Sequence, residues 1–134
     1  MDRTDSGKVK SELKQWPIQL HLVSRMAPCF NECHLLLSAD CCAFAFGAFH
    51  TELLKGRRVA IACLKLDDTG NYVDKIAEII KNNKIYSLTV VIMSVPCCSG
   101  LEHMVERGVE LSGKGLPVNT LVVDIDGNIK TKKG

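Results

Sequence analysis

The sequence predicts a single α/β domain in which helices cover both faces of a mostly parallel sheet of about five strands. Three observations support this class. Short β-type runs alternate with helical or connecting segments along the chain. The later β-type runs are almost continuous in Val, Ile, Leu and Ala, as in strands that are buried on both faces. The length of 134 residues suits one domain with a sizeable core.

The β-type runs define the expected strands. In chain order they are residues 17–23 (PIQLHLV), 34–39 (HLLLSA), 58–63 (RVAIAC), 87–95 (SLTVVIMSV) and 119–125 (NTLVVDI). Between them, helical spacing of apolar residues predicts helices over 72–80 and 101–109, with Gly113 as a stop for the second. A further helix is expected over 43–54. The link 24–33 has room for one or two helical turns. Right-handed crossovers between such strands give a Rossmann-like or flavodoxin-like arrangement.

The domain is expected to span residues 16–130, after a polar N-terminal segment (1–15) and before a basic tail (131–134). The first fifteen residues lack the apolar stretch of a signal peptide, and no apolar run is long enough to span a bilayer. We therefore expect a soluble, cytoplasmic protein. The formal net charge of +2 is too small to indicate nucleic-acid binding, and no basic stripe interleaves with aromatic residues. We expect no nucleic-acid or membrane partner.

Seven cysteines are the unusual feature of the composition. Their odd number argues against the disulfide framework of a small secreted domain. No Cys-x-x-Cys spacing occurs, so the common zinc-finger and bacterial ferredoxin patterns are absent. Any metal ligands must therefore be gathered by the fold.

Three cysteine positions follow predicted strands. Cys41 and Cys42 come after the second strand, Cys63 ends the third, and Cys97 and Cys98 follow the fourth. In an open parallel sheet, ligands bind in the crevice outside the carboxyl ends of the strands. These thiols could therefore converge on a metal or a small ligand.

The stretch SVPCCSGLEH (94–103) places two of these cysteines just before a helix. Ser99 and Glu102 have the spacing of a capping box, which predicts that the helix begins at Ser99. The positive end of the helix dipole favours thiolate over thiol at Cys97 and Cys98. Gly100 permits close approach of a ligand. The alternative is that each cysteine is a small buried core residue.

Other polar residues have simpler interpretations. The group Cys29, Cys33 and His34 is expected to be structural, because the last two lead into an apolar strand. His21 and His50 taken alone are ordinary core or surface histidines. Lys65, Asp67 and Asp68 follow the third strand and could line the crevice, although the two aspartates are better explained as helix caps. Residues 124–128 (DIDGN) are expected to form a turn.

Several stretches resemble the C-terminal α/β domain of prokaryotic ferredoxin-type (4Fe-4S) iron–sulfur cluster-binding proteins, which occur in anaerobes and archaea. They are WPIQLHLV (16–23), SADCCAFAF (38–46), FHTELLKGRRVAIACLKLDD (49–68) and SLTVVIMSVPCCSGL (87–101). The resemblance implies an iron–sulfur or redox association. The family's cysteine positions match Cys41, Cys63, Cys97 and Cys98, and its strand histidine matches His21. The N-terminal ferredoxin motifs of that family are missing from this chain.

Three functional hypotheses follow. In the first, the protein is a metal-binding or iron–sulfur-associated redox accessory domain. Cys41, Cys63 and Cys97 are then ligands, Cys98 or His21 is the fourth, and the metal is an iron–sulfur cluster or zinc. Lys65, Ser99 and Gly100 are the cofactor-binding candidates. In the second, the protein is a metal-free thiol-redox or small-molecule enzyme. In the third, it is a non-catalytic module that docks a ferredoxin-type or other redox partner.

Overall fold

The computed structural model describes residues 9–63, 70–94 and 99–132. Its centre is a five-stranded sheet with the strand order β2-β1-β3-β4-β5. The strands are β1 (Cys33–Ala39), β2 (Arg58–Ala62), β3 (Ile85–Met93), β4 (Val118–Val123) and β5 (Ile129–Lys132). The first four are mutually parallel, and β5 pairs antiparallel with β4. The predicted α/β class with a mostly parallel sheet is confirmed.

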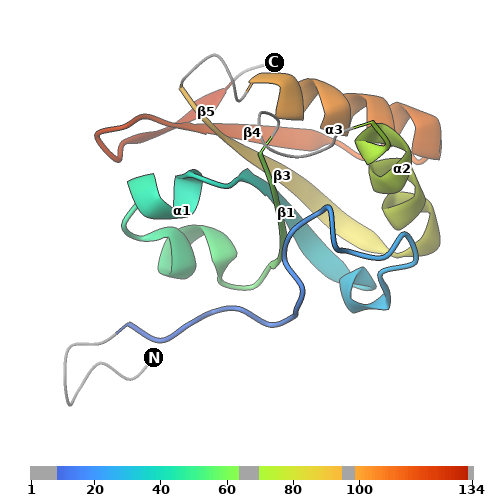
Figure 1. Cartoon of the computed structure of the whole chain (residues 1–134), viewed down its shortest axis with the longest axis horizontal. Coiled ribbons are helices and arrows are strands. Elements are labelled where there is room, and N and C mark those ends of the chain that lie inside the picture. Colours follow the sequence, from blue (N-terminus) through green and yellow to red (C-terminus); the bar gives the residue numbers. More distant parts are fainter. Residues whose placement is uncertain (1–8, 64–69, 95–98, 133–134) are drawn as a thin grey trace.

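Helices cover both faces of this sheet, as expected for strands that are apolar throughout (Figure 1). Helices α2 (Tyr72–Asn82) and α3 (Ser99–Ser112) lie together on one face. The short α1 (Cys42–Ala45) and the π-helical segment η2 (Phe49–Leu54) lie on the other. A single 3-10 turn, η1 (Pro28–Phe30), precedes β1 and agrees with the short helical link expected there.

The close approach of α2 and α3 depends on one small residue. A Cβ atom added to Gly108 would lie 2.6 Å from Cγ2 and 2.9 Å from Cβ of Ile76. Ile76 is itself fully buried in the core between the helices and the sheet. Gly108 therefore fixes how closely the two helices pack.

The expected helix over 43–54 is interrupted. Helix α1 ends at Ala45, where Phe46 adopts an extended conformation, and η2 begins only at Phe49. Phe46 and Phe49 are both buried against the sheet, so burying both rings takes precedence over one continuous helix.

The first predicted strand, residues 17–23, is not a strand. Only Gln19 bridges to the sheet, opposite Ile61 of β2, and the chain then turns so that the amide of Val23 donates to the carbonyl of Gln19. The prediction failed because Leu22 is 60% exposed, while Leu20 and Val23 are buried. That spacing of three fits a turn, whereas a strand alternates.

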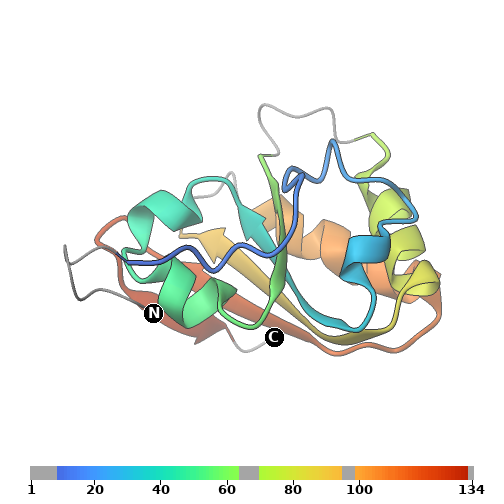
Figure 2. The ribbon, with the colours of Figure 1, turned by 90° about the horizontal axis from the view of Figure 1, so that it is seen from below.

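Residues 15–23 cover the outer edge of β2, and Figure 2 shows this segment running beside the strand. The amide of Ile61 donates to Ile18 (2.8 Å) and the amide of Leu20 donates to Ile61 (2.8 Å). The side chain of Gln15 pairs with the backbone of β2 as a neighbouring strand would. Its Nε2 donates to the carbonyl of Val59 (2.7 Å), and its Oε1 accepts from the Val59 amide (3.3 Å). An otherwise open sheet edge is thereby protected from pairing with another chain.

Strand β5 was not predicted from the sequence, because the fifth predicted strand, residues 119–125, corresponds to β4. Residues 124–128 form the expected turn, in which Oδ1 of Asp124 accepts from the amides of Asp126 (2.9 Å) and Asn128 (3.0 Å). The chain then returns as β5, which includes the first two residues of the expected tail, Thr131 and Lys132. A short, lysine-rich strand at the edge of a sheet is a common protection against aggregation.

Among the described residues, no helix is long and apolar enough to cross a membrane.

Candidate functional site

The order of the strands creates a topological switch point between β1 and β3. The chain leaves β1 through α1 and η2 on one face, whereas it leaves β3 through α3 on the opposite face (Figure 1). Beyond the carboxyl ends of two such strands the connections diverge and open a crevice, where ligands of open α/β sheets bind. Asp40 and Cys41 follow β1 at this point, and Ser94 follows β3.

Among the described cysteines, Cys41 is the exposed one. It is exposed and occupies the N-cap position of α1, with no side-chain capping hydrogen bond. Its neighbour Cys42 is completely buried, and the Cys42 thiol lies 3.6 Å from the carbonyl oxygen of Val91 in β3. The two adjacent cysteines therefore have different environments, and Cys41 is the one available to a ligand.

Cys63 lies at the end of the strand next to β1. Ala39 pairs with Ala62 in the parallel register, and the amide of Asp40 donates to the carbonyl of Ala62 (3.1 Å). Cys63 follows directly and is half-buried. Cys41 and Cys63 thus follow two neighbouring parallel strands at the same edge of the sheet.

The remaining candidates are partly outside the described residues. Five of them fall in the ranges that the structure does not describe, namely Lys65, Asp67, Asp68, Cys97 and Cys98. Helix α3 begins at Ser99, as the capping-box pattern predicted, and Gly100 is its second residue. Oε2 of Glu102 accepts a hydrogen bond from Oγ1 of Thr120 (2.9 Å), which ties the first turn of α3 to β4.

His21 does not lie in a strand, in contrast to the prediction. It is exposed on the turn beside β2 and lines a cavity of about 350 Å³ with Gly70, Asn71 and Lys75. Within the described ranges, no three His, Cys, Asp or Glu side chains gather in a way that could hold a metal ion. The described part of the chain thus supplies two thiols at the edge, and the other predicted thiol ligands fall outside it.

The donor set nevertheless suits a soft metal. Thiolate sulfur is the ligand that zinc and iron–sulfur clusters share, and two thiols at the ends of paired strands satisfy part of such a set. Cys41 is exposed, so a ligand in solvent can reach its sulfur.

The cysteines at the other end of β1 are structural, as expected. The Cys33 thiol donates to the carbonyl of Phe30 (3.0 Å), and burial raises its pKa to about 11. Burial also raises the pKa of Cys29. His34 points elsewhere, with its Nδ1 2.8 Å from Oγ of Ser87. These residues belong to the amino end of the sheet, away from the switch point.

Lys75 is the charged residue that the sequence analysis overlooked. It is 8% exposed, and its ammonium donates to the carbonyls of Leu20 (3.0 Å) and His21 (3.2 Å). The signal was its position on α2, three residues after Tyr72 and four before Ile79, which are both buried. A lysine at that spacing lies on the apolar face of the helix.

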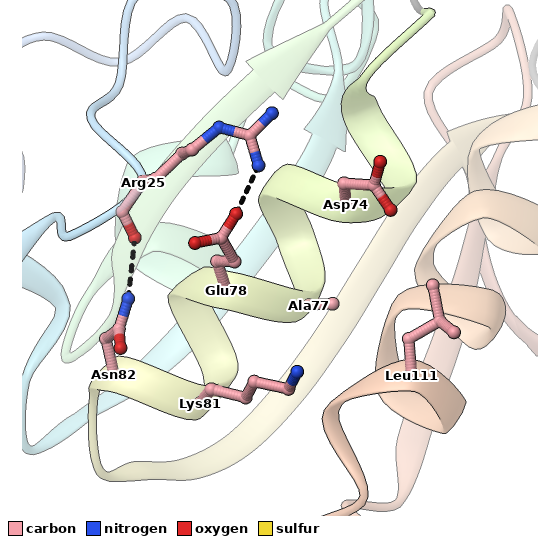
Figure 3. A pocket seen from close by; sticks show the side chains of 7 residues that line it. All are labelled: Arg25, Asp74, Ala77, Glu78, Lys81, Asn82 and Leu111. Carbon is pink, nitrogen blue, oxygen red and sulfur yellow. Dashed lines mark hydrogen bonds and ion pairs between the residues drawn. The ribbon is translucent and has the colours of Figure 1, made fainter.

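A second cavity, of about 370 Å³, lies along the outer side of α2, where Arg25, Lys81 and Leu111 are among its lining residues. Figure 3 shows Arg25 paired with Glu78, while the side-chain amide of Asn82 donates to the carbonyl of Arg25 (3.4 Å). These contacts hold the link before β1 against α2. The cavity therefore lies between the link that carries Arg25 and the helices α2 and α3. The charges of Arg25 and Glu78 in it neutralise each other.

Comparison with known proteins agrees with this architecture. Residues 27–134 match the model of a family described as "Rossmann-like domain". The chain belongs to the Rossmann-like domain family. It is also 30% identical over 119 residues to an uncharacterized protein of Archaeoglobus fulgidus. The aligned region covers 89% of this chain and 84% of that protein. No solved structure matches the chain.

In open α/β folds such as this one, ligands bind beyond the carboxyl ends of the strands. Family membership alone specifies no reaction, because this architecture supports many chemistries. The function must therefore be inferred from the residues at this edge of the sheet.

Proposed function

We propose that this Rossmann-like domain is a cysteine-ligated metal-binding accessory protein with a redox role, related to the C-terminal domains of ferredoxin-type iron–sulfur proteins. The observation that carries the proposal is the position of Cys41 and Cys63 at the carboxyl ends of two paired strands. In this family of folds, that edge is where ligands bind.

The proposed ligands are Cys41, Cys63, Cys97 and Cys98. We choose Cys98 as the fourth ligand in preference to His21, because His21 shares its cavity with the ammonium of Lys75. A neighbouring cation disfavours a bound metal cation at the same place.

An iron–sulfur cluster is the proposed cofactor, with zinc as the alternative that the same thiolates would accept. A bound cluster would supply one-electron redox chemistry. The chain's own part is to hold the thiolates. The strand ends fix the backbone at positions 41 and 63, and the start of α3 at Ser99 brings a positive helix end to this edge. Lys65, Ser99 and Gly100 would contact the cofactor.

A ferredoxin-type redox protein is the proposed partner. Phe44, three residues after Cys41, is 93% exposed, which is unusual for a phenylalanine. An exposed aromatic ring beside the proposed ligand would favour contact with a protein at this edge. An electron carrier needs its partner close to the metal, so this position suits the proposed role.

The test is the metal content of protein purified without oxygen, with iron, zinc and acid-labile sulfide each measured per chain. We expect the Cys41→Ser and Cys63→Ser variants to lose most of the metal that the wild type holds. The matched control is Cys29→Ser, also a half-buried cysteine but near the opposite end of β1, which should retain it. Full retention of metal in both edge variants would refute the proposal.

The kind of metal separates the alternatives. Iron with sulfide supports the redox role, and zinc alone supports a metal site without electron transfer. Absence of metal from the wild type would favour the metal-free thiol-redox enzyme. That alternative predicts that the number of thiols titrated differs before and after treatment with a reductant.

A further inference from the structure

Within the described residues, the buried ammonium of Lys75 has no negatively charged partner. Its two contacts are the carbonyl oxygens of Leu20 and His21, which are neutral acceptors. In the ranges that the structure describes, one ion pair forms, between Arg25 and Glu78, and it does not include Lys75. A buried charge without a counter-charge is costly, so its retention calls for an explanation.

The surroundings of Lys75 increase that cost. Burial lowers the pKa of Lys75, and the positive charge of Arg25 lowers it further. Both effects act against the charged form. An anion next to the ammonium would reverse both, because it would replace the lost hydration and add a favourable charge.

The ammonium lines the cavity of about 350 Å³ that it shares with His21, Gly70 and Asn71. His21 enters from the turn beside β2, while Gly70 and Asn71 come just before α2. Lys75 can donate three hydrogen bonds and uses two of them on the turn. Among the described residues no third acceptor is found for the ammonium, so one of its protons is available to a group in the cavity.

The N-terminal end of α2 supports the same preference. Asn71 holds the N-cap position, but its side chain makes no capping hydrogen bond, so its amide can serve a ligand instead. The helix has eleven residues, and its dipole places partial positive charge at this end. The ammonium and the helix dipole thus favour a negative group, whereas the exposed Asp74 in the first turn of α2 acts against one.

We propose that this cavity binds an oxyanion, specifically the phosphate group of a small molecule, with Lys75 as its principal ligand and with His21 and Asn71 as further donors. The site is distinct from the thiols and does not depend on metal binding. It lies where α2 begins, after the carboxyl end of β2, and so on the ligand-binding edge of the sheet.

A purely structural role is the alternative. Lys75 would then only hold the turn of Gln19–Val23 against α2 through its two carbonyl contacts. In that case inorganic phosphate would have no specific effect, and only the loss of Lys75 would alter stability. The two roles therefore differ in their response to phosphate.

The experiment measures the melting temperature of the protein in inorganic phosphate and in chloride at equal ionic strength, together with the NMR signals of His21. We expect phosphate to raise the melting temperature of the wild type and to shift the His21 ring signals in a saturable way. A ligand that binds the folded state stabilises it according to its concentration relative to Kd.

Two variants and one control keep the test decisive. His21→Gln lies on an exposed turn and should fold, and we expect it to weaken the phosphate effect several-fold. Lys75→Met should abolish the effect. Lys81→Met, on the exposed side of α2, should preserve it. The proposal is overturned if phosphate and chloride act alike on the wild type, or if His21→Gln and Lys81→Met respond equally.

Discussion

The thiol of Cys42 lies 3.6 Å from the carbonyl oxygen of Val91, which places one of two adjacent cysteines inside the core while the other faces solvent. This contact anchors α1 to β3, the strand on the other side of the switch point. It therefore helps to hold Cys41 just beyond the carboxyl end of β1. The pair shows how a packing cysteine can orient a cysteine that is available for chemistry.

Thiol reactivity should separate these two residues. In metal-free protein we expect iodoacetamide to modify Cys41 rapidly and Cys42 slowly, because a buried thiol reacts only after local opening. Each 1.4 kcal/mol of opening free energy slows the reaction about tenfold. Mass spectrometry of the peptide that contains both residues checks this. The Cys41→Ser variant should lose the fast modification, and rapid labelling that persisted in it would contradict the assignment.

Substitution of Gly108 by Ala should destabilise the protein. The added methyl group would overlap Ile76, and overpacking of a core costs about 1–3 kcal/mol. Alanine also gains about 1 kcal/mol in helix propensity over glycine, so the net loss should be smaller than the overpacking cost. Urea denaturation measures it. Gly47→Ala, where an added Cβ meets nothing within 4 Å, is the matched control and should be nearly neutral.

The covered edge of β2 gives a further prediction. Gln15→Ala removes both hydrogen bonds to the backbone of Val59, and we expect a loss of about 1–3 kcal/mol in the free energy of unfolding. Gln19→Ala removes an exposed side chain from the same segment and should change it by less than about 0.5 kcal/mol. Equal effects of the two substitutions in urea denaturation would show that the Gln15 contact contributes little.

Cys33 should make stability depend on alkaline pH. Its pKa is about 11 in the folded protein, against 9.0 as the ordinary value, because burial disfavours the thiolate. The stabilisation is thus complete below about pH 9 and is lost as the pH rises towards about 11. The free energy of unfolding of the wild type should therefore fall more steeply over this range than that of Cys33→Ala. Cys41→Ala, which removes an exposed thiol, should follow the wild type, and parallel curves for all three proteins would contradict the prediction.

Much of the fold could be predicted from local patterns. The strands at 33–39, 58–62, 85–93 and 118–123 have long apolar runs, and α2 and α3 have clear helical spacing. The first strand and the last could not be assigned correctly. Residues 17–23 are largely apolar, but this segment meets β2 only through the side chain of Gln15 and one bridge from Gln19 to Ile61. Strand β5 lies at an edge of the sheet and is largely polar, so it lacks the apolar pattern of a buried strand. Both depend on tertiary pairing rather than on local propensity.

The candidate site shows the same division. The positions of Cys41 and Cys63 at one edge follow from strand ends and parallel pairing, which the sequence pattern reveals. The burial of Cys42 beside an exposed Cys41 depends on how α1 packs on β3. The role of Lys75 depends on a turn fifty-five residues earlier in the chain, which supplies the carbonyl of Leu20. Neither could be read from spacing alone.

The central claim is that the cysteines at the carboxyl edge form one ligand set. X-ray absorption at the iron and zinc edges of anaerobically purified protein tests it most directly, because the fine structure identifies the atoms bound to the metal. We predict a shell of sulfur ligands, at about 2.3 Å if the metal is zinc, which loses occupancy in Cys41→Ser. A shell made up of oxygen and nitrogen atoms, or a sulfur shell unchanged in that variant, would contradict the claim.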